Sequence, residues 1–251
     1  MIPKTIHYFW FGGARKPAMI RKCMKSWKRI CPDYQVIEWN ESNIDIADCP
    51  LFVRQAYEAE KWAFVTDYLR LWAVHEYGGI YLDADVELVR RPDFLLCNRA
   101  YFGFEEKKYI NTGLGFGAEK GHPILRELMY AYENNPFVRA DDSIDNTPCP
   151  VRDLKVFLQY GLQQNNQRQM LKEGVCILPS EYLNPYSYKS GKKRITPNTI
   201  SIHWFAGSWL SWEELKMQAE KRKKNRRIIR EIRKMELVNR AKCCILSVFR
   251  Q

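Results

Sequence analysis

Short apolar runs alternate with segments of helical periodicity along most of this chain. Runs rich in β-branched and aromatic residues are typical of buried strands. We expect strands at residues 4–11, 34–39, 80–89, 100–104, 109–118, 175–178 and 199–204. Helices are expected at residues 17–30, 51–77 with a break near Trp62, 123–135 and 151–164. Strands that alternate with helices favour a Rossmann-like α/β domain with a mostly parallel central sheet.

Ligands bind at the carboxyl ends of the strands in such sheets, and one predicted strand carries acids. The strand over residues 80–89 contains Asp83 and Asp85, two positions apart. In an extended backbone these side chains point to the same side, and they repel each other unless a cation lies between or beside them. Oxygen ligands of this kind suit Mg²⁺ or Mn²⁺. The alternative is a strand end that reaches solvent, with both carboxylates hydrated.

The helix before this strand carries a second pair of charged residues. Asp67 and Arg70 are three positions apart, so they share a helix face. Gly78-Gly79 ends the helix, as glycine commonly does, and the chain enters the acidic strand directly. We therefore expect this pair to share one cleft with the two strand aspartates, where a guanidinium group could bind hydroxyls or phosphate. A purely structural ion pair is the alternative.

Two other predicted strand ends carry candidate ligand contacts. Trp10 precedes Gly12-Gly13 and is suited to stack on a base, or it is a core aromatic. His203 is either a metal or diphosphate contact or a satisfied structural histidine. His7 is interpreted as structural. The sequence contains no Gly-x-Ser-x-Gly nucleophile elbow and no Gly-x-x-x-x-Gly-Lys-Ser/Thr phosphate loop.

The charge of the chain is concentrated near its C-terminus. The formal net charge is +11, and residues 216–242 hold 12 Lys and Arg against 3 Glu, which is +9 and leaves +2 for the rest. We predict a domain over residues 1–212 and a basic amphipathic helical tail over residues 213–251, with Ser211-x-x-Glu214 as a capping box. An apolar stripe between basic residues favours contact with an anionic membrane surface. Packing on the body and nucleic-acid binding are the alternatives, and we expect no nucleic acid.

Cysteine usage and the N-terminal segment bear on the compartment. The eight cysteines form no C-x-x-C pair, and Met1 leads within a few residues into a strand-like run, so we expect no signal peptide and reduced thiols. No apolar run approaches the length of a bilayer span. These features predict a cytoplasmic protein, peripheral at the inner face of the membrane.

Several motifs occur together and in order along the chain. They are Ile2-Pro3-Lys4-Thr5-Ile6-His7-Tyr8-Phe9-Trp10, Thr66-Asp67-Tyr68-Leu69-Arg70, Gly78-Gly79-Ile80-Tyr81-Leu82-Asp83-Ala84-Asp85, Asn111-Thr112-Gly113 through Gly121-His122-Pro123, and Ile202-His203-Trp204-Phe205-Ala206-Gly207-Ser208-Trp209. Together they resemble glycosyltransferase family 32, whose members carry a DXD sugar-binding motif. The resemblance extends from residue 2 to about residue 212.

This resemblance implies a GT-A fold, a nucleotide-diphosphate sugar donor with a UDP-hexose foremost, Mn²⁺ or Mg²⁺ as cofactor, and retention of anomeric configuration. It also implies the following roles: Trp10 near the donor base, Asp67 and Arg70 at the donor sugar, Asp83 at the ribose or sugar and at a metal-bound water, Asp85 as metal ligand, Asn111 near the transferred sugar, and His203, Ser208 and Trp209 closing over the diphosphate. Whether His203 or Ser208 ligates the metal is left open.

The resulting hypothesis is transfer of a hexose to a glycan or lipid-linked glycan in the synthesis of a surface polysaccharide such as a capsule. Two other classes of protein fit parts of the pattern. A metal-dependent phosphodiesterase or nuclease could use the same aspartates, with the basic tail on nucleic acid. A non-catalytic nucleotide-sugar-binding module would need only the recognition residues.

Overall fold

The computed structural model describes residues 1–106, 108–187, 191–206, 217 and 220. The chain divides into two compact units, one of residues 1–185 with 194–206 and the other of residues 186–193 with 207–251. In the second unit, an isolated bridge pairs Tyr186 with Lys193. The predicted boundary at residue 212 and, apart from Met217 and Glu220, the predicted helical tail lie outside the described residues. The described helices include none with the length and apolar character of a membrane span.

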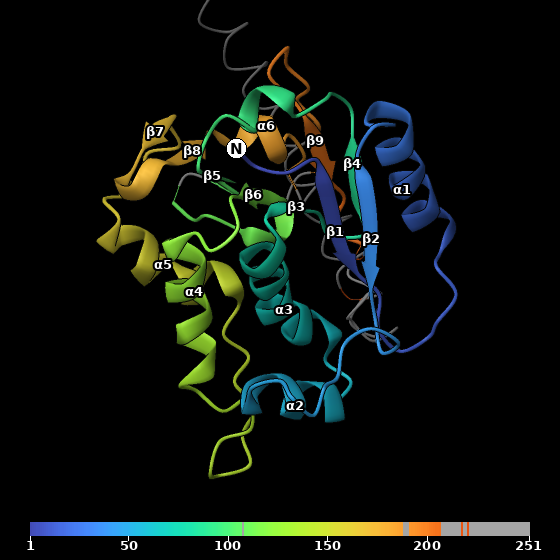
Figure 1. The fold of residues 1–251 in the computed structure, drawn as a ribbon, viewed down its shortest axis with the longest axis vertical. Coiled ribbons are helices and arrows are strands. Elements are labelled where there is room, and N and C mark those ends of the chain that lie inside the picture. The colour runs from blue at the N-terminus through green and yellow to red at the C-terminus, as the bar shows by residue number, and fades with distance from the viewer. Residues whose placement is uncertain (107, 188–190, 207–216, 218–219, 221–251) are drawn as a thin grey trace, which may run out of the picture. The chain divides into compact units, whose positions relative to one another are not determined.

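The first unit is built on a seven-stranded sheet in the order β2-β1-β3-β6-β5-β8-β7 (Figure 1). Its strands are β1 (Thr5–Phe9), β2 (Gln35–Trp39), β3 (Gly79–Tyr81), β5 (Ala100–Gly103), β6 (Phe116–Ala118), β7 (Gln169–Met170) and β8 (Val175–Leu178). Five of them point the same way, whereas β6 and β7 run opposite. The prediction of an α/β fold with a mostly parallel central sheet is confirmed.

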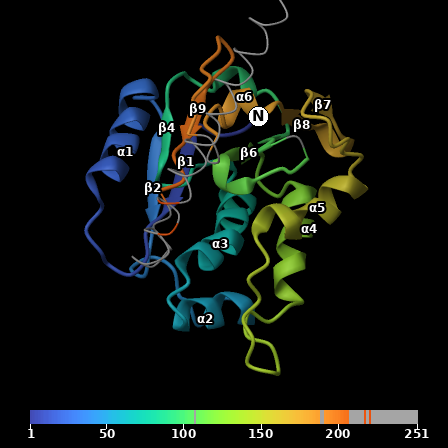
Figure 2. The ribbon, with the colours of Figure 1, turned by 180° about the vertical axis from the view of Figure 1, so that it is seen from behind.

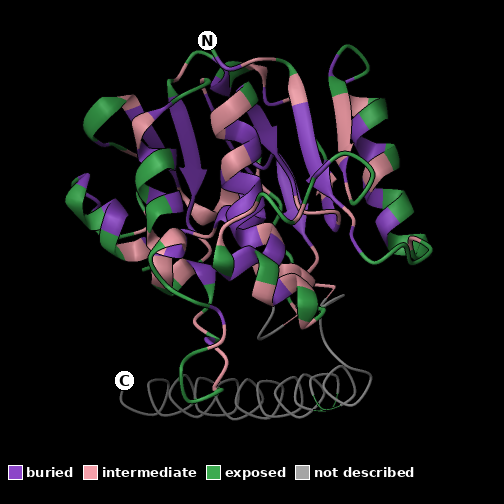
Figure 3. Ribbon diagram, turned by 60° about the horizontal axis from the view of Figure 1, so that its bottom comes forward, coloured by how far each residue is buried: buried purple, intermediate pink, exposed green. Residues whose placement is uncertain are grey.

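Helices and a second small sheet cover the two faces of this central sheet (Figure 2). One face packs on α2 (Leu51–Glu58), α3 (Trp62–Tyr77), α4 (Pro123–Glu133) and α5 (Cys149–Gln159). The other packs on α1 (Ala18–Ile30), α6 (Ser180–Leu183) and the antiparallel pair β4 (Val86–Leu88) and β9 (Ser201–His203). The inner strands β1, β3, β5, β6 and β8 are therefore buried on both sides, as the continuous apolar runs indicate and as the burial colouring shows (Figure 3), whereas the edge strands β2 and β7 are more exposed.

The structure corrects the strand predicted over residues 80–89. The chain forms two strands there, β3 in the central sheet and β4 in the small sheet. Asp83 and Asp85 lie in the turn between them, which is closed by a hydrogen bond from the Val86 N–H to the Asp83 carbonyl at 2.9 Å. The premise that an extended backbone aligns the two carboxylates is therefore wrong, because it is the turn that directs them.

Other element predictions are confirmed within a few residues, with two further differences. The strand expected over residues 109–118 is shorter in the structure, where a 3₁₀ turn, η2 (Thr112–Leu114), precedes β6. The short elements α6 and β7 were not predicted, since two to four residues give too little periodicity to recognise.

The connection from α3 into β3 depends on close backbone packing. Gly79 has φ +109°, and a Cβ atom there would lie 2.7 Å from the Thr5 carbonyl oxygen of the adjacent strand. His7 fills the space beside it: its Nε2 lies 2.9 Å from the Gly78 carbonyl, and its Nδ1 accepts a hydrogen bond from Trp39. The structural role predicted for His7 is thus confirmed. This packing fixes the direction in which the chain leaves β3 toward the acidic turn.

Candidate active site

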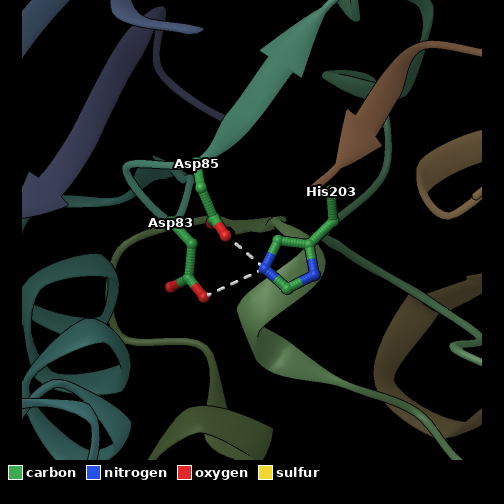
Figure 4. A group of neighbouring side chains, drawn as sticks. All are labelled: Asp83, Asp85 and His203. Carbon is green, nitrogen blue, oxygen red and sulfur yellow. Dashed lines mark ion pairs between the residues drawn. The ribbon is translucent and has the colours of Figure 1, made fainter. Parts of the chain in front are cut away.

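Two aspartates and one histidine converge beside the carboxyl end of β3 (Figure 4). The Nε2 nitrogen of His203 lies 3.1 Å from Asp85 Oδ1 and 3.6 Å from Asp83 Oδ2. One ligand atom from each residue lies within 4.8 Å of the others. The side chains of Asp85 and His203 are nearly buried, whereas that of Asp83 is 28% exposed. The cluster is therefore reached from solvent on the Asp83 side.

The small sheet brings these residues together. In the β4–β9 ladder, Val86 pairs with His203, so the histidine lies beside the residue that follows Asp85. After β9 the chain bends at Phe205, which has φ +50°, an unusual backbone conformation for an aromatic residue. The bend brings the Ala206 N–H to Asp85 Oδ2 at 2.7 Å. Asp85 is thus fixed by both strands of the pair.

The electrostatics of the cluster favour a cation. Burial alone would lower the pKa of His203, but Asp85 and Asp83 raise it to about 10. Burial opposes ionisation of Asp85, yet the imidazolium and the Ala206 N–H hold the pKa of Asp85 below its usual range. The protonated imidazole therefore supplies the positive charge that two adjacent carboxylates require.

The same donor set fits a divalent metal. Two carboxylate oxygens and one imidazole nitrogen are suitable ligands for Mn²⁺, which accepts both oxygen and imidazole donors. The other ring nitrogen of His203, Nδ1, is buried without a hydrogen-bond partner among the described residues. A metal at Nε2 would take the place of the proton, since ligating histidines are neutral.

The predicted pair on α3 lies on the other side of Asp83. Arg70 forms an ion pair with Asp67, and its Nη1 lies 3.5 Å from Asp83 Oδ1. Its Nε donates to the Thr66 carbonyl at 3.1 Å, and its guanidinium lies over the Tyr81 ring at 5.3 Å. With a side chain only 4% exposed, Arg70 contacts these groups rather than water. The four charged residues predicted to share a cleft are therefore adjacent.

Two of the remaining predicted residues, Trp10 and Asn111, lie in the described part of the chain. Trp10 is half-buried, its indole N–H donates to the Ala14 carbonyl at 2.6 Å, and Lys16 lies over its ring at 5.4 Å. Asn111 caps η2 by accepting the Gly113 N–H at 2.6 Å, and it donates to Glu105 at 3.0 Å. Ser208 and Trp209 lie outside the described residues.

Two residues next to the site, Tyr81 and Asp153, were not predicted from the sequence. The Tyr81 hydroxyl donates to Asp83 Oδ1, although the tyrosine lies inside the recognised motif. Asp153 lies behind η2 and accepts hydrogen bonds from Thr112 and Tyr132. A lone aspartate in a helix carries no motif, so only the packing of α5 reveals it.

Parts of the chain are similar to known proteins. Residues 17–101 match the family model described as a glycosyltransferase sugar-binding region containing the DXD motif. Over 135 residues the chain is 31% identical to inositol phosphoceramide mannosyltransferase 3 of Schizosaccharomyces pombe. That match covers 51% of this chain and 36% of the relative, so the chain spans little more than a third of that protein's length.

Solved structures with partial similarity carry related descriptions. The PaToxG glycosyltransferase aligns with a TM-score of 0.49 and 19% identity, over 63% of this chain and 69% of that one. A glycosyltransferase involved in glycosylation of the major capsid of PBCV-1 aligns with a TM-score of 0.43 and 12% identity, over 88% and 98% of the two chains.

The family match and the curated relative both fit a glycosyltransferase with a DXD sugar-binding region. The resemblance to glycosyltransferase family 32 drawn from the sequence is thereby confirmed, and the matched region contains Asp67, Arg70, Asp83 and Asp85. The α/β sheet described above agrees with the GT-A class predicted with it.

Proposed function

We propose that this protein transfers a hexose from a nucleotide-diphosphate sugar to a carbohydrate hydroxyl, with a divalent cation held by Asp85, Asp83 and His203. The observation that carries the proposal is the convergence of these three side chains on one point. Their position near the carboxyl ends of β1 and β3 is where α/β sheets bind ligands.

The difficult step in such a transfer is departure of the nucleoside diphosphate from the anomeric carbon. A divalent cation, when bound, neutralises the charge that develops on the diphosphate. Asp85 and His203 are already fixed by the β4–β9 ladder and the Ala206 N–H, so the ligands need little reorganisation. Asp83, the more exposed ligand, faces the side from which a donor enters.

Arg70 contributes a buried positive charge beside Asp83. It is held by Asp67 and the Thr66 carbonyl, and its charge fixes the orientation of Asp83. We propose that Asp67 and Arg70 define the sugar side of the donor site and that Asn111 lies near the transferred sugar. A preorganised buried charge of this kind stabilises a developing charge without reorganisation.

The donor we propose is a UDP-hexose, with retention of anomeric configuration as the family resemblance implies. The name of the Schizosaccharomyces pombe relative describes a mannosyltransferase, which supports a hexose and keeps mannose among the candidates. A glycan or lipid-linked glycan at the cytoplasmic face of a membrane is the proposed acceptor, with the basic segment over residues 216–242 as the membrane contact.

A donor panel tests the proposal. Wild-type protein is incubated with UDP-glucose, UDP-galactose, UDP-N-acetylglucosamine or GDP-mannose, with Mn²⁺ or with EDTA, and release of the nucleoside diphosphate is measured. We expect Mn²⁺-dependent release from at least one donor. Metal-dependent cleavage of nucleic acid without cleavage of any donor would instead support the phosphodiesterase hypothesis. Binding of a donor without turnover would support a non-catalytic module.

A further inference from the structure

A fully buried carboxylate lies behind the site, outside every motif discussed above. Asp153 on α5 has no exposed surface. Its Oδ2 accepts a hydrogen bond from the Thr112 hydroxyl at 3.3 Å, and its Oδ1 accepts one from the Tyr132 hydroxyl at 3.2 Å. Thr112 is also completely buried. Asp153 therefore joins α5 and α4 to the η2 turn.

The η2 turn lies directly against the charged residues of the site. A Cβ atom at Gly113 would lie 2.9 Å from Arg70 Nη1 and 2.9 Å from Asp83 Oδ2. The backbone of the turn thus packs as closely as glycine allows against the two groups that the proposed transfer uses. Asn111, at the start of the turn, is held by the Gly113 N–H. Any shift of the turn displaces Asn111 and frees Arg70 and Asp83 to move.

Burying a carboxylate is costly unless its surroundings compensate. Burial raises the pKa of Asp153 to about 7, and Arg70, the two hydroxyl groups and Arg152 partly oppose that rise. The Cys149 thiol, one turn earlier on α5, is also buried, and burial raises its pKa to about 12. A fold that needed only packing at this position would be better served by an apolar side chain.

We propose that Asp153 is a positioning residue that, through Thr112, holds the η2 turn against Arg70 and Asp83 and so sets the wall of the donor-sugar site. The inference rests on the proposed function for its effect on turnover, but its structural part does not. Asp153 touches neither donor nor metal, because it has no accessible surface. Its action passes through one hydroxyl group to the turn.

Three variants test this chain of contacts: Asp153→Ala, Asp153→Asn and Thr112→Val. The first readout is the NMR resonances of the Gly113 amide and the Arg70 Nε–H, which report the position of the turn whether or not the protein is active. We expect Asp153→Ala and Thr112→Val to shift both resonances. Each resonance should move in the same direction in the two variants. Asp153→Asn keeps an acceptor and a donor for the two hydroxyl groups, so we expect both resonances to stay close to their wild-type positions.

The second readout is kcat with the donor that the wild-type protein hydrolyses best among UDP-glucose, UDP-galactose, UDP-N-acetylglucosamine and GDP-mannose. We expect about a tenfold or greater loss for Asp153→Ala and for Thr112→Val, since small displacements of positioned groups cost large factors in rate. The double variant that combines Asp153→Ala with Thr112→Val should lose little more kcat than either single variant, because the effects of two residues that act through one contact are not additive. Asp153→Asn should recover most of the loss.

Glu133→Gln provides the matched control. Glu133 on α4 also accepts a tyrosine hydroxyl, that of Tyr68 at 2.9 Å, but it has no contact with η2 among the described interactions, so we expect wild-type kcat. Thr112→Val replaces the hydroxyl group with a methyl group of similar size, so we expect it to fold even if Asp153→Ala does not. If Thr112→Val leaves both resonances unchanged, the inference is wrong. A wild-type protein inactive on every donor would contradict the proposed function, while the NMR comparison would still decide the role of Asp153.

Discussion

Asp85 is the proposed metal ligand whose surroundings are most completely defined. It accepts the Ala206 N–H, lies 3.1 Å from His203 Nε2 and is nearly buried. A carboxylate in such a place is held ionised only by a partner of opposite charge. Removal of the charge of Asp85 is therefore expected to weaken binding of the cation.

Replacing Asp85 with asparagine keeps the shape of the side chain and removes the charge. We expect Mn²⁺ affinity, measured by isothermal titration calorimetry, to fall about tenfold or more, since loss of one charged ligand from a small set weakens the site. Asp93→Asn serves as control, because Asp93 pairs with Arg91 at the surface. Equal Mn²⁺ affinity in wild type and Asp85→Asn would refute the assignment of Asp85.

Gly113 permits the close approach of the η2 turn, and an added methyl group tests it. In Gly113→Ala the new Cβ would lie within 3.0 Å of Arg70, Asp83 and Asn111. One of these groups must move, so we expect at least about a tenfold loss of turnover. Steady-state kinetics on the active donor, with circular dichroism to confirm folding, measures the effect. Wild-type turnover would show that the turn is not part of the site.

The site residues divide by whether a motif marks them. Asp67, Arg70, Asp83 and Asp85 could be predicted to lie together because a helix with one charged pair leads directly, through Gly78-Gly79, into the segment with the other. The near-complete burial of Arg70 could not, since it depends on the Tyr81 ring above it and on η2 beside it. Asp153 was missed because its importance arises only from contacts across α4, α5 and η2.

At the scale of elements, α5 carries a carboxylate whose ionisation opposes folding. The pKa of Asp153 is raised by burial to about 7 from an ordinary value of 3.8. At pH values between these two, Asp153 is protonated in the folded state and ionised in the unfolded state. The free energy of unfolding therefore falls as pH rises from about 4 to about 7 and then levels off.

Asp153→Asn cannot ionise at this position, so the variant should lack this pH dependence of the free energy of unfolding. Between pH 5 and pH 8 the wild-type protein should lose on the order of 2 kcal/mol of unfolding free energy relative to the variant. Urea unfolding of both proteins at the two pH values gives the difference. A constant difference between them at both pH values would argue against a raised pKa for Asp153.

The strand pairing explains which elements could be predicted. The long helix α3 and the fully buried strand β8 follow from local apolar patterns. The division of residues 80–89 into β3 and β4 does not, because β4 pairs with β9, which lies far along the chain. That same long-range pairing places His203 beside Asp85, so sequence reasoning could propose the histidine but could not decide its role.

At the scale of the whole molecule, the basic segment follows all of the predicted site residues in the sequence. The charge of +9 over residues 216–242 is predicted to bind an anionic membrane. Truncation after Ser211 should preserve Mn²⁺-dependent donor hydrolysis and reduce sedimentation with phosphatidylserine vesicles, each basic residue near the surface contributing about 1 kcal/mol. Neutral phosphatidylcholine vesicles are the control. Undiminished binding by the truncated protein would dispose of the membrane role.

The central claim is that Asp83, Asp85 and His203 hold one divalent cation at the diphosphate of the donor. Anomalous diffraction at the manganese absorption edge, from crystals grown with Mn²⁺ and UDP, tests it most directly. The account predicts one anomalous peak within coordination distance of Asp85 and beside the diphosphate, with Asp83 and His203 around it. A bound nucleotide with no peak at these residues, or a peak elsewhere, would contradict it.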